Sequence, residues 1–336
     1  MKLGWRGALG IVISIAALAW TLRDVSLHEV GEVLRHSNPV LLVLSGLVAT
    51  LVFPLRALRW RVILEPVTEA PYAPLWRSVA IGMMVNNVAP ARAGELARAY
   101  AATREVRSLS FAASLASLAV DRIVDAVVVV ALLALAVAVS DIPPETTING
   151  WTVTKLVYVA GGIAVTALAG VTIVAFVPGL VTRVFDAIFE HRAPLVHRRG
   201  RALLDSLISG LGALRSPGRF VRIVGWATAL WLVNAAAFYI GFLGVGIQVP
   251  FAAAVFVASL IAVGVAAPSS PGFVGVFEFF AKAGLALYGV PSGLAVSWGL
   301  AFHFLSFVPI TLIGLVYFGR LGLHFKDLGK PEQQPA

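Results

Sequence analysis

Two charged interruptions in an otherwise apolar chain hold the side chains that could carry out chemistry. The first runs from Asn86 to Arg98, and the second runs from Pro268 to Glu278. Each contains a proline and a glycine four residues apart, with a glutamate close behind. Broken helices direct unpaired backbone groups into a cavity, and their N-termini favour anions. The pattern therefore predicts one polar site inside a membrane, built from both interruptions.

The candidate ligands of this site are amides, hydroxyls and charged side chains. Guanidinium groups match phosphate oxygens, so the arginines are expected to contact a lipid phosphate. The carboxylates would hold these arginines in place or meet a cationic headgroup, and a buried glutamate could couple movement to protons, because burial raises the pKa of a carboxyl. The predicted substrate-binding residues are Asn86, Asn87, Arg92, Glu95, Arg98, Asp121, Arg122, Asp125, Ser269, Ser270, Glu278 and Lys282.

Several of these residues also have a purely structural interpretation. Glu278 and Lys282 lie one helical turn apart and can neutralise each other as a salt bridge. The first interruption can be a charged helix start at the cytoplasmic boundary, with Asn87 as its cap. His303 is a lone histidine in the last apolar stretch, where a packed or cavity-lining side chain is expected. The sequence leaves both interpretations open.

Motifs of common enzyme classes are absent from the sequence. It has no Gly-xxxx-Gly-Lys-Ser/Thr loop, no histidine and carboxylate cluster with metal-ligand spacing, and no cysteine. Ser269 and Ser270 have no base nearby in the sequence and are expected to cap a broken helix. We therefore expect no enzymatic activity, no cofactor and no metal.

The composition indicates a membrane protein. The chain is 59% hydrophobic and 13% charged, with a mean hydropathy of +0.89. Several apolar runs reach the ~20 residues that a helix needs to cross a bilayer. They lack period-two alternation, which favours helices over a barrel. The predicted fold class is an all-α polytopic membrane protein, and the net charge of +9 fits basic cytoplasmic loops better than nucleic-acid binding.

The apolar pattern predicts about eight transmembrane helices and one or two re-entrant hairpins. The first span is 7–22, for which a cleaved signal peptide is the alternative, and an interfacial helix is expected at 24–37. Residues 73–107 are expected to form a re-entrant hairpin, because polar residues break their apolar run. Further spans are predicted at 39–55, 108–140, 153–177, 221–244, 250–267 and 294–318, with another helix from the second interruption to about Leu287. The repeated proline and glycine spacing is compatible with an inverted repeat.

One transmembrane domain is expected over residues 1–323, followed by a short polar tail at 324–336. The segment 178–222 carries eight arginines and is the strongest cytoplasmic marker in the chain. Its apolar residues have helical spacing, so an amphipathic helix on the cytoplasmic side is predicted. Both termini are expected in the cytoplasm, with the protein in a bacterial inner membrane.

A cluster of Arg56, Arg59 and Trp60 follows the second predicted span. Arginines beside a tryptophan are typical of a membrane boundary. The indole is expected at the level of the lipid headgroups and the guanidinium groups near phosphates. The alternative is anchoring by positive charge alone.

Four motifs resemble, in order and spacing, the family of lysylphosphatidylglycerol synthase transmembrane regions, also called flippase-like domains. They are Arg56–Trp60, Asn87–Arg98, Asp121–Asp125 and Pro268–Glu278. In MprF-type members this region moves aminoacylated phosphatidylglycerol between leaflets, and relatives are linked to hopanoid transport and archaeal glycolipid pathways. The resemblance implies a flippase or scramblase for a phosphate-bearing lipid. MprF-type proteins continue into a soluble aminoacyltransferase domain, whereas this chain stops at Ala336, so aminoacyl transfer is expected to be absent.

Two other functions remain open from the sequence. One is a membrane enzyme or accessory subunit that acts on a polyprenyl phosphate or a glycolipid. The other is a structural partner of a separate lipid-modifying synthase. The expected partners are a membrane phospholipid or isoprenoid lipid and no nucleic acid, and a homo-oligomer remains open.

Overall fold

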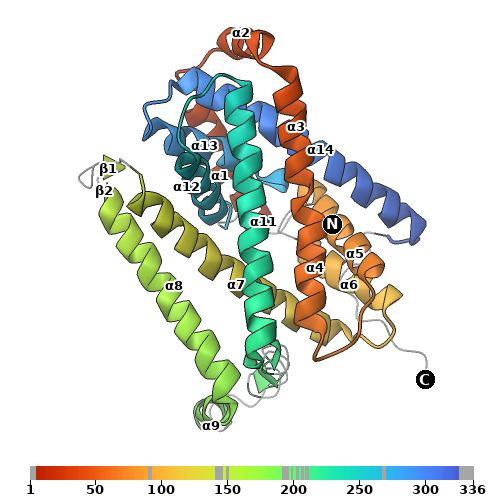
Figure 1. The fold of residues 1–336 in the computed structure, drawn as a ribbon. Coiled ribbons are helices and arrows are strands. Elements are labelled where there is room, and N and C mark those ends of the chain that lie inside the picture. The colour runs from red at the N-terminus through yellow and green to blue at the C-terminus, as the bar shows by residue number, and fades with distance from the viewer. Residues whose placement is uncertain are drawn as a thin grey trace.

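The computed structural model describes residues 5–89, 93–140, 147–148, 151–190, 197, 200–201, 204–205, 208, 212–266 and 270–324. They form the predicted all-α polytopic membrane protein, with one two-residue antiparallel β-ladder (Figure 1). The first helices are α1 (Trp5–Leu22), α2 (Leu27–His36), α3 (Pro39–Thr50), α4 (Val52–Leu64), α5 (Tyr72–Val88), α6 (Gly94–Glu105) and α7 (Phe111–Ala138). They are followed by β1 (Thr147–Ile148), β2 (Trp151–Thr152), α8 (Val153–Phe176), α9 (Pro178–Phe189), η1 (Gly212–Arg215), α11 (Pro217–Gly244), α12 (Phe251–Gly264), η2 (Pro271–Phe273), α13 (Val276–Ala286) and α14 (Ser292–Arg320).

Three helical segments among the described residues are long and apolar enough to cross a membrane. They are Pro39–Leu64, which comprises α3 and α4, together with α11 and α14. The pair Ile11–Leu22 and Leu27–His36 would form a fourth span across a bend of 73°. The sequence predicted about eight spans, and α12 shows one source of the difference. Its 14 residues extend only ~21 Å, less than the ~30 Å of hydrocarbon that a full span must cross.

The chain continues as α4 beyond Leu55, where the sequence placed the end of the second span. Pro54 lies in the first turn of α4, where its missing N–H costs no helical hydrogen bond. Most of the following residues of α4 are buried against other helices. The helix therefore carries its polar residues into the protein interior.

Each interruption lies between two short helices that pack against each other. The first pair is α5 and α6, of 17 and 12 residues, and the second is α12 and α13, of 14 and 11 residues. None of the four reaches ~30 Å at 1.5 Å per residue. The first pair is the hairpin predicted at 73–107. The second interruption, for which the sequence left re-entry open, has the same arrangement of two short helices.

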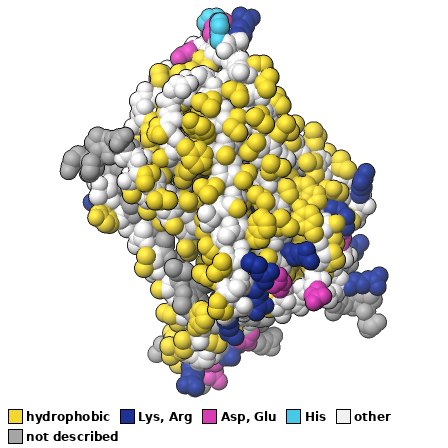
Figure 2. Space-filling model, viewed as in Figure 1, with side chains coloured by type: hydrophobic (Ala, Val, Ile, Leu, Met, Phe, Trp, Pro, Cys, Tyr) yellow, Lys and Arg dark blue, Asp and Glu magenta, His cyan; other side chains and the backbone are white. Residues whose placement is uncertain are grey.

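The surface is divided between an apolar belt and charged ends. In Figure 2 hydrophobic side chains cover the middle and upper part of the molecule, and Lys and Arg gather toward the lower part, where Figure 1 shows α9. α9 forms the start of the predicted amphipathic segment, whereas Leu203, Leu207 and Leu211 lie outside the described residues. Hydrogen bonds from Arg201 and His197 lower the pKa of the Asp186 carboxyl on this helix. The distribution is that of a multi-pass protein with one basic face.

Candidate functional site

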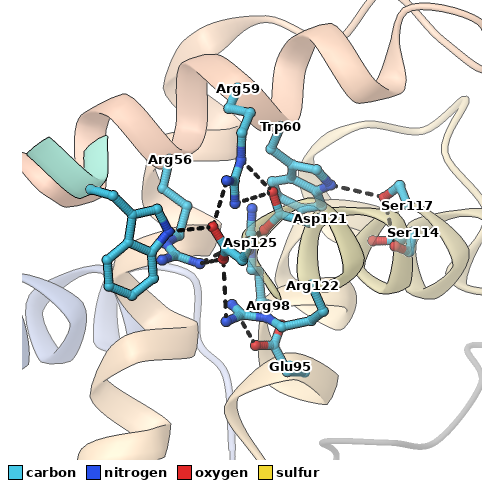
Figure 3. A network of polar contacts seen from close by, with 11 residues as sticks. Arg56, Arg59, Trp60, Glu95, Arg98, Ser114, Ser117, Asp121, Arg122 and Asp125 are labelled. Carbon is cyan, nitrogen blue, oxygen red and sulfur yellow. Dashed lines mark hydrogen bonds and ion pairs between the residues drawn. The ribbon is translucent and has the colours of Figure 1, made fainter. Parts of the chain in front are cut away.

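Two aspartates on α7 form the centre of a buried ion-pair network with α4 and α6 (Figure 3). Asp121 accepts hydrogen bonds from Arg59 Nε at 2.8 Å and from Arg98 Nη1 at 3.1 Å. Asp125 accepts from Arg59 Nη1 at 2.6 Å and from Arg56 Nη1 at 3.0 Å. The two aspartates are four residues apart, so one face of α7 presents both of them, as their spacing predicted.

Two tryptophans complete the network. Trp60 Nε1 donates to Ser117 Oγ at 2.8 Å, and the Arg98 guanidinium carbon lies 4.1 Å from the centre of the Trp60 ring. Trp231 Nε1 on α11 donates to Asp125 Oδ1 at 3.0 Å. A cation over an aromatic face gains up to ~2 kcal/mol when both are desolvated. The indoles therefore fix the orientation of charged groups that have left water.

In this network Arg56, Arg59 and Trp60 contact other helices and not lipid headgroups, while their level in the membrane stays a prediction. Arg59 and Trp60 are fully buried, and Arg56 is nearly so. They face α7 because α4 continues into the bundle, where Asp121 and Asp125 provide carboxylates. Buried charges are tolerated only with such partners, since desolvation costs several kcal/mol per ion. The three residues thus belong to the interior polar site.

Glu95 and Arg122 form the more exposed edge of the network. Arg122 Nη2 lies 2.9 Å from Glu95 Oε1, and Arg122 Nη1 lies 3.7 Å from Asp125 Oδ2. In formal charges, the network holds four guanidinium groups and three carboxylates, which leaves one positive charge in excess. Arg56 Nε and the Nε and Nη2 atoms of Arg98 are buried without an acceptor in the described part of the protein. The arrangement is suited to an anion.

The two asparagines of the first interruption have different contacts. Asn86 Oδ1 accepts a hydrogen bond from the Gly94 N–H at 2.9 Å, so Asn86 satisfies the first amide of α6. The sequence proposed Asn87 for this role. Asn87 Nδ2 instead donates to Thr311 Oγ1 on α14 at 2.7 Å and faces a cavity.

This cavity has a volume of about 230 Å³ and lies among α3, α4, α5, α11, α12, η2, α13 and α14. Its wall is mostly apolar and aromatic, and its polar side chains include Arg56, Asn87, Asn234, His303 and Ser306. Arg56 also lines a second cavity of about 10 Å³, which it shares with Glu95, Arg98 and Arg122. Arg56 therefore belongs both to the wall of the larger cavity and to the ion-pair network, as does Trp231.

The second interruption approaches the same cavity with an unusual backbone. Gly272, Phe273 and Gly275 have φ angles of +66°, +61° and +87°. Phe273, which lines the cavity, pays ~1–2 kcal/mol for the left-handed region because it has a Cβ atom. Contacts from outside the loop must therefore hold it in this conformation.

Glu278 and His303 provide these contacts. Glu278 is 1% exposed, its Oε2 accepts from the Gly275 N–H at 2.7 Å, and its Oε1 lies 2.6 Å from His303 Nδ1. His303 Nε2 lies 2.7 Å from the Gly272 carbonyl oxygen. His303 lines the cavity, in agreement with the sequence, which did not include it among the site residues.

Lys282 has no contact with Glu278, although one helical turn separates them. Its Nζ donates to the Thr21 carbonyl oxygen at 3.0 Å and forms a salt bridge with Asp24 after α1. The Glu278–Lys282 salt bridge considered from the sequence does not form, because each side chain has another partner. Lys282 is buried but does not line the cavity.

Most of the described site residues that the sequence predicted thus fall into two groups that adjoin one cavity, and Lys282 belongs to neither. One group is the network that contains Arg56, and the other is the Glu278–His303 pair with its loop. Ser270 belongs to the second group, and its N–H donates to Ser14 Oγ on α1 at 2.8 Å. The predicted residues outside the described part of the chain are Arg92 and Ser269.

Sequence reasoning missed two residues of α11. Asn234 lines the cavity, and Trp231 both lines it and binds Asp125. An asparagine within an apolar helix was a usable signal, since polar side chains in membrane helices commonly bind another helix or face a cavity. No comparable feature of the sequence indicated the role of Trp231.

Three archaeal proteins are similar to this chain. The glycosyltransferase AglD of Haloferax volcanii is 28% identical over 295 residues, which are 80% of this chain and 47% of that protein. Two proteins of Methanothermobacter thermautotrophicus, both described as UPF0104 membrane proteins, are 27% and 24% identical over 333 and 334 residues. These matches cover 92% and 94% of this chain and 93% and 96% of the relatives. The chain spans about half the length of the glycosyltransferase.

The similarity to a glycosyltransferase contradicts the prediction that this chain is not an enzyme. That prediction rested on missing motifs for nucleotide, metal and thiol chemistry. A missing motif does not exclude an activity.

A family model described as the lysylphosphatidylglycerol synthase TM region matches residues 7–314. The match includes both interruptions, the aspartates of α7 and the arginines of α4. It agrees with the resemblance found in the four motifs. The chain therefore belongs to the family of the lysylphosphatidylglycerol synthase TM region.

Proposed function

We propose that this protein moves a phosphate-bearing lipid between the two leaflets of a membrane, as a flippase or scramblase. The observation that carries the proposal is the position of Arg56. Its side chain lines an interior cavity of about 230 Å³ and is part of a buried network with excess positive charge. A polar headgroup would enter this cavity with its phosphate beside Arg56.

The network is better suited to bind a phosphate than a neutral headgroup. Arg56 and Arg98 have buried N–H groups without acceptors in the described protein, and Arg122 is held near them by Glu95. A lipid phosphate would accept hydrogen bonds from these groups and balance the excess charge. Hydrogen bonds between a guanidinium and a phosphate are about twice as strong as neutral ones.

The cavity is too small for a whole lipid. Pockets that enclose drug-sized ligands have volumes of ~300–1,000 Å³, and this cavity is below that range. α3, which contributes Ala49 to the cavity wall, exposes Val40, Val43 and Leu47 on its outer side. We infer that the acyl or isoprenoid chains remain in the bilayer while the headgroup crosses.

The basic end of the molecule, with α9, would face the cytoplasm. Cytoplasmic loops of membrane proteins carry an excess of Lys and Arg. In this orientation α4 lies nearer the cytoplasm than α3, because it follows α3 toward the basic end (Figure 1). Both termini in the cytoplasm, and a bacterial inner membrane as the location, remain part of the proposal.

Replacing Arg56 with alanine is expected to slow lipid movement about 10-fold or more. The loss of a hydrogen bond to a charged group costs ~1.5–3 kcal/mol, and 1.4 kcal/mol corresponds to a factor of ~10. The measurement is the transfer of a fluorescent phospholipid between leaflets of proteoliposomes, followed by reduction of the label in the outer leaflet. Asp125 would keep Arg59, Arg122 and Trp231 as partners, so the variant should fold.

Two further variants make this experiment specific. Arg56→Lys keeps the charge but loses the planar fork, so an intermediate rate is expected. Arg222→Ala removes a half-exposed arginine that pairs with Glu65 at the surface, and its rate should equal that of the parent. A folded Arg56→Ala protein with the parental rate would rule out the assigned site.

The glycosyltransferase relative favours a second candidate function, which is transfer of a sugar to a polyprenyl phosphate or a glycolipid. The same arginines would then hold the lipid phosphate during the reaction. Incubation of the purified protein with polyprenyl phosphate and a labelled nucleotide sugar tests this candidate. A labelled glycolipid would support transfer. Co-purification of a synthase would instead support an accessory role.

A further inference from the structure

Glu278 and His303 bind the two glycines of the loop between Ser270 and Gly275, while the Ser270 N–H donates to Ser14 Oγ on α1. The Gly275 N–H donates to Glu278 Oε2, and the Gly272 carbonyl lies 2.7 Å from His303 Nε2. The pair itself is joined by the 2.6 Å contact between Glu278 Oε1 and His303 Nδ1. One carboxyl and one imidazole therefore hold both glycines of a loop that contains a strained residue.

The hydrogen-bond partners determine how many protons the pair holds. A carbonyl oxygen can only accept, so His303 Nε2 must carry a hydrogen and donate it to Gly272. The short contact between Glu278 Oε1 and His303 Nδ1 then requires one more proton, on either atom. With this proton the pair has no net charge, as a carboxylic acid with neutral imidazole or as a carboxylate with imidazolium.

Loss of the shared proton would break this arrangement. A neutral imidazole has only one N–H, so His303 could then donate either to Glu278 Oε1 or to the Gly272 carbonyl oxygen, and the other contact would bring two acceptors together. One of the two side chains must then move, and each of them binds one glycine of the loop. The released proton would pass to water in the cavity that His303 lines, and the pair would keep one negative charge.

Few charged groups surround the pair. Lys282, one turn further along α13, is bound to Asp24, and Arg56 of α4 lies on the wall of the shared cavity. The charged residue of α5, Arg77, is paired with Glu105. α3, α12 and the described side chains of α1 carry no charge, and the other charge of α14 lies at its C-terminal end. Two more helices with titratable side chains pack against α14: α2 with His28, Glu29, Glu32, Arg35 and His36, and α11 with Arg219 and Arg222 in its first two turns. Among the described residues, no positively charged side chain forms an ion pair with Glu278 other than His303 itself. The negative charge left by loss of the proton would therefore have no ion-pair partner there.

We propose that Glu278 and His303 form a proton-binding site whose occupancy controls the Ser270–Gly275 loop. With the proton bound, the loop is fixed and Phe273 stays in the cavity wall. Without it, the loop is released and the cavity changes shape. Coupling of this step to lipid movement rests on the proposed transport function, whereas proton binding and loop release do not.

A spin label on the loop tests the proposal directly. The chain has no cysteine, so Val274→Cys, at a 44% exposed position, gives a single attachment site. The label is expected to rotate faster as the pH of the detergent solution is raised. A label at Leu27→Cys, which is 74% exposed and far from the loop in sequence, should show no such change.

Two substitutions have opposite expected effects on this label. Glu278→Gln can donate to His303 Nδ1 and accept from Gly275, as the protonated carboxyl does, so the label should stay slow at every pH. His303→Leu removes the donor to Gly272, so the label should be fast at every pH. The proposal would be overturned if the label on the parent protein rotated at the same rate at every pH. It would also be overturned if the label on the Glu278→Gln variant still rotated faster at higher pH.

Transport measurements separate this proposal from the proposed function. In proteoliposomes with a pH difference across the membrane, the rate of lipid movement should follow that difference in the parent and lose this dependence in Glu278→Gln. A parent rate that is measurable but independent of pH overturns the coupling. If no lipid moves in any variant, the transport function fails, and the label spectra still decide whether the proton site exists.

Discussion

Replacing Asp121 with alanine is expected to destabilise the folded protein by about 3–5 kcal/mol, the cost of removing one partner from a buried ion pair. Asp121 is fully buried and accepts hydrogen bonds from Arg59 and Arg98. Without it, Arg98 would lose the carboxylate that offsets its desolvation, and Arg59 would retain only Asp125. The measurement is the free energy of unfolding in mixed detergent micelles, or the yield of folded protein where the variant does not assemble.

A substitution in an exposed ion pair is the matched control for Asp121→Ala. Glu65 on the rim of the bundle forms a similar pair with Arg222 at 2.7 Å, but both side chains are substantially exposed. Glu65→Ala is expected to cost less than about 1 kcal/mol, because exposed ion pairs contribute little. Equal effects of the two substitutions would show that the interior network does not exclude water as the structure indicates.

The helical membrane fold follows from local properties of the sequence. Apolar length and the absence of alternation indicate spanning helices, and α7, α8, α11 and α14 lie within a few residues of their predicted ranges. Helix ends that depend on contacts with residues distant in the sequence were harder to predict. α4 continues past Leu55 because carboxylates of α7 receive its arginines, and no local pattern reports this.

The same distinction applies to the candidate site. The spacing of Asp121 and Asp125 was sufficient to place both on one helix face, since a helix has a fixed period. Their partners come from three other helices, α4, α6 and α11. Spacing alone left a Glu278–Lys282 salt bridge open, whereas tertiary packing pairs Glu278 with His303 and Lys282 with Asp24. Sequence reasoning thus identified which residues are polar and interior, but not which of them meet.

The close approach of α5 and α6 leads to the second large expected effect, that of Gly94→Ala. A Cβ atom at Gly94 would lie 2.1 Å from the carbonyl oxygen of Gly82 and 2.4 Å from the Asn86 side chain. The first of these neighbours is backbone, so the two helices must separate. Small residues allow such close helix contacts in membranes, and overpacking a well-packed interior costs about 1–3 kcal/mol.

This substitution should also reduce lipid movement, because α6 carries Arg98 one turn after Gly94. Separation of the helices would draw Arg98 away from Asp121 and disturb the small cavity that both helices line. Gly225→Ala in α11 is the control, since no atom lies within 4 Å of its added Cβ. That variant should be as stable as the parent or more stable by about 0.5–1 kcal/mol, the helical advantage of alanine over glycine. If the Gly94→Ala and Gly225→Ala variants have the same free energy of unfolding and the same rate of lipid movement, the contact between α5 and α6 does not position the network.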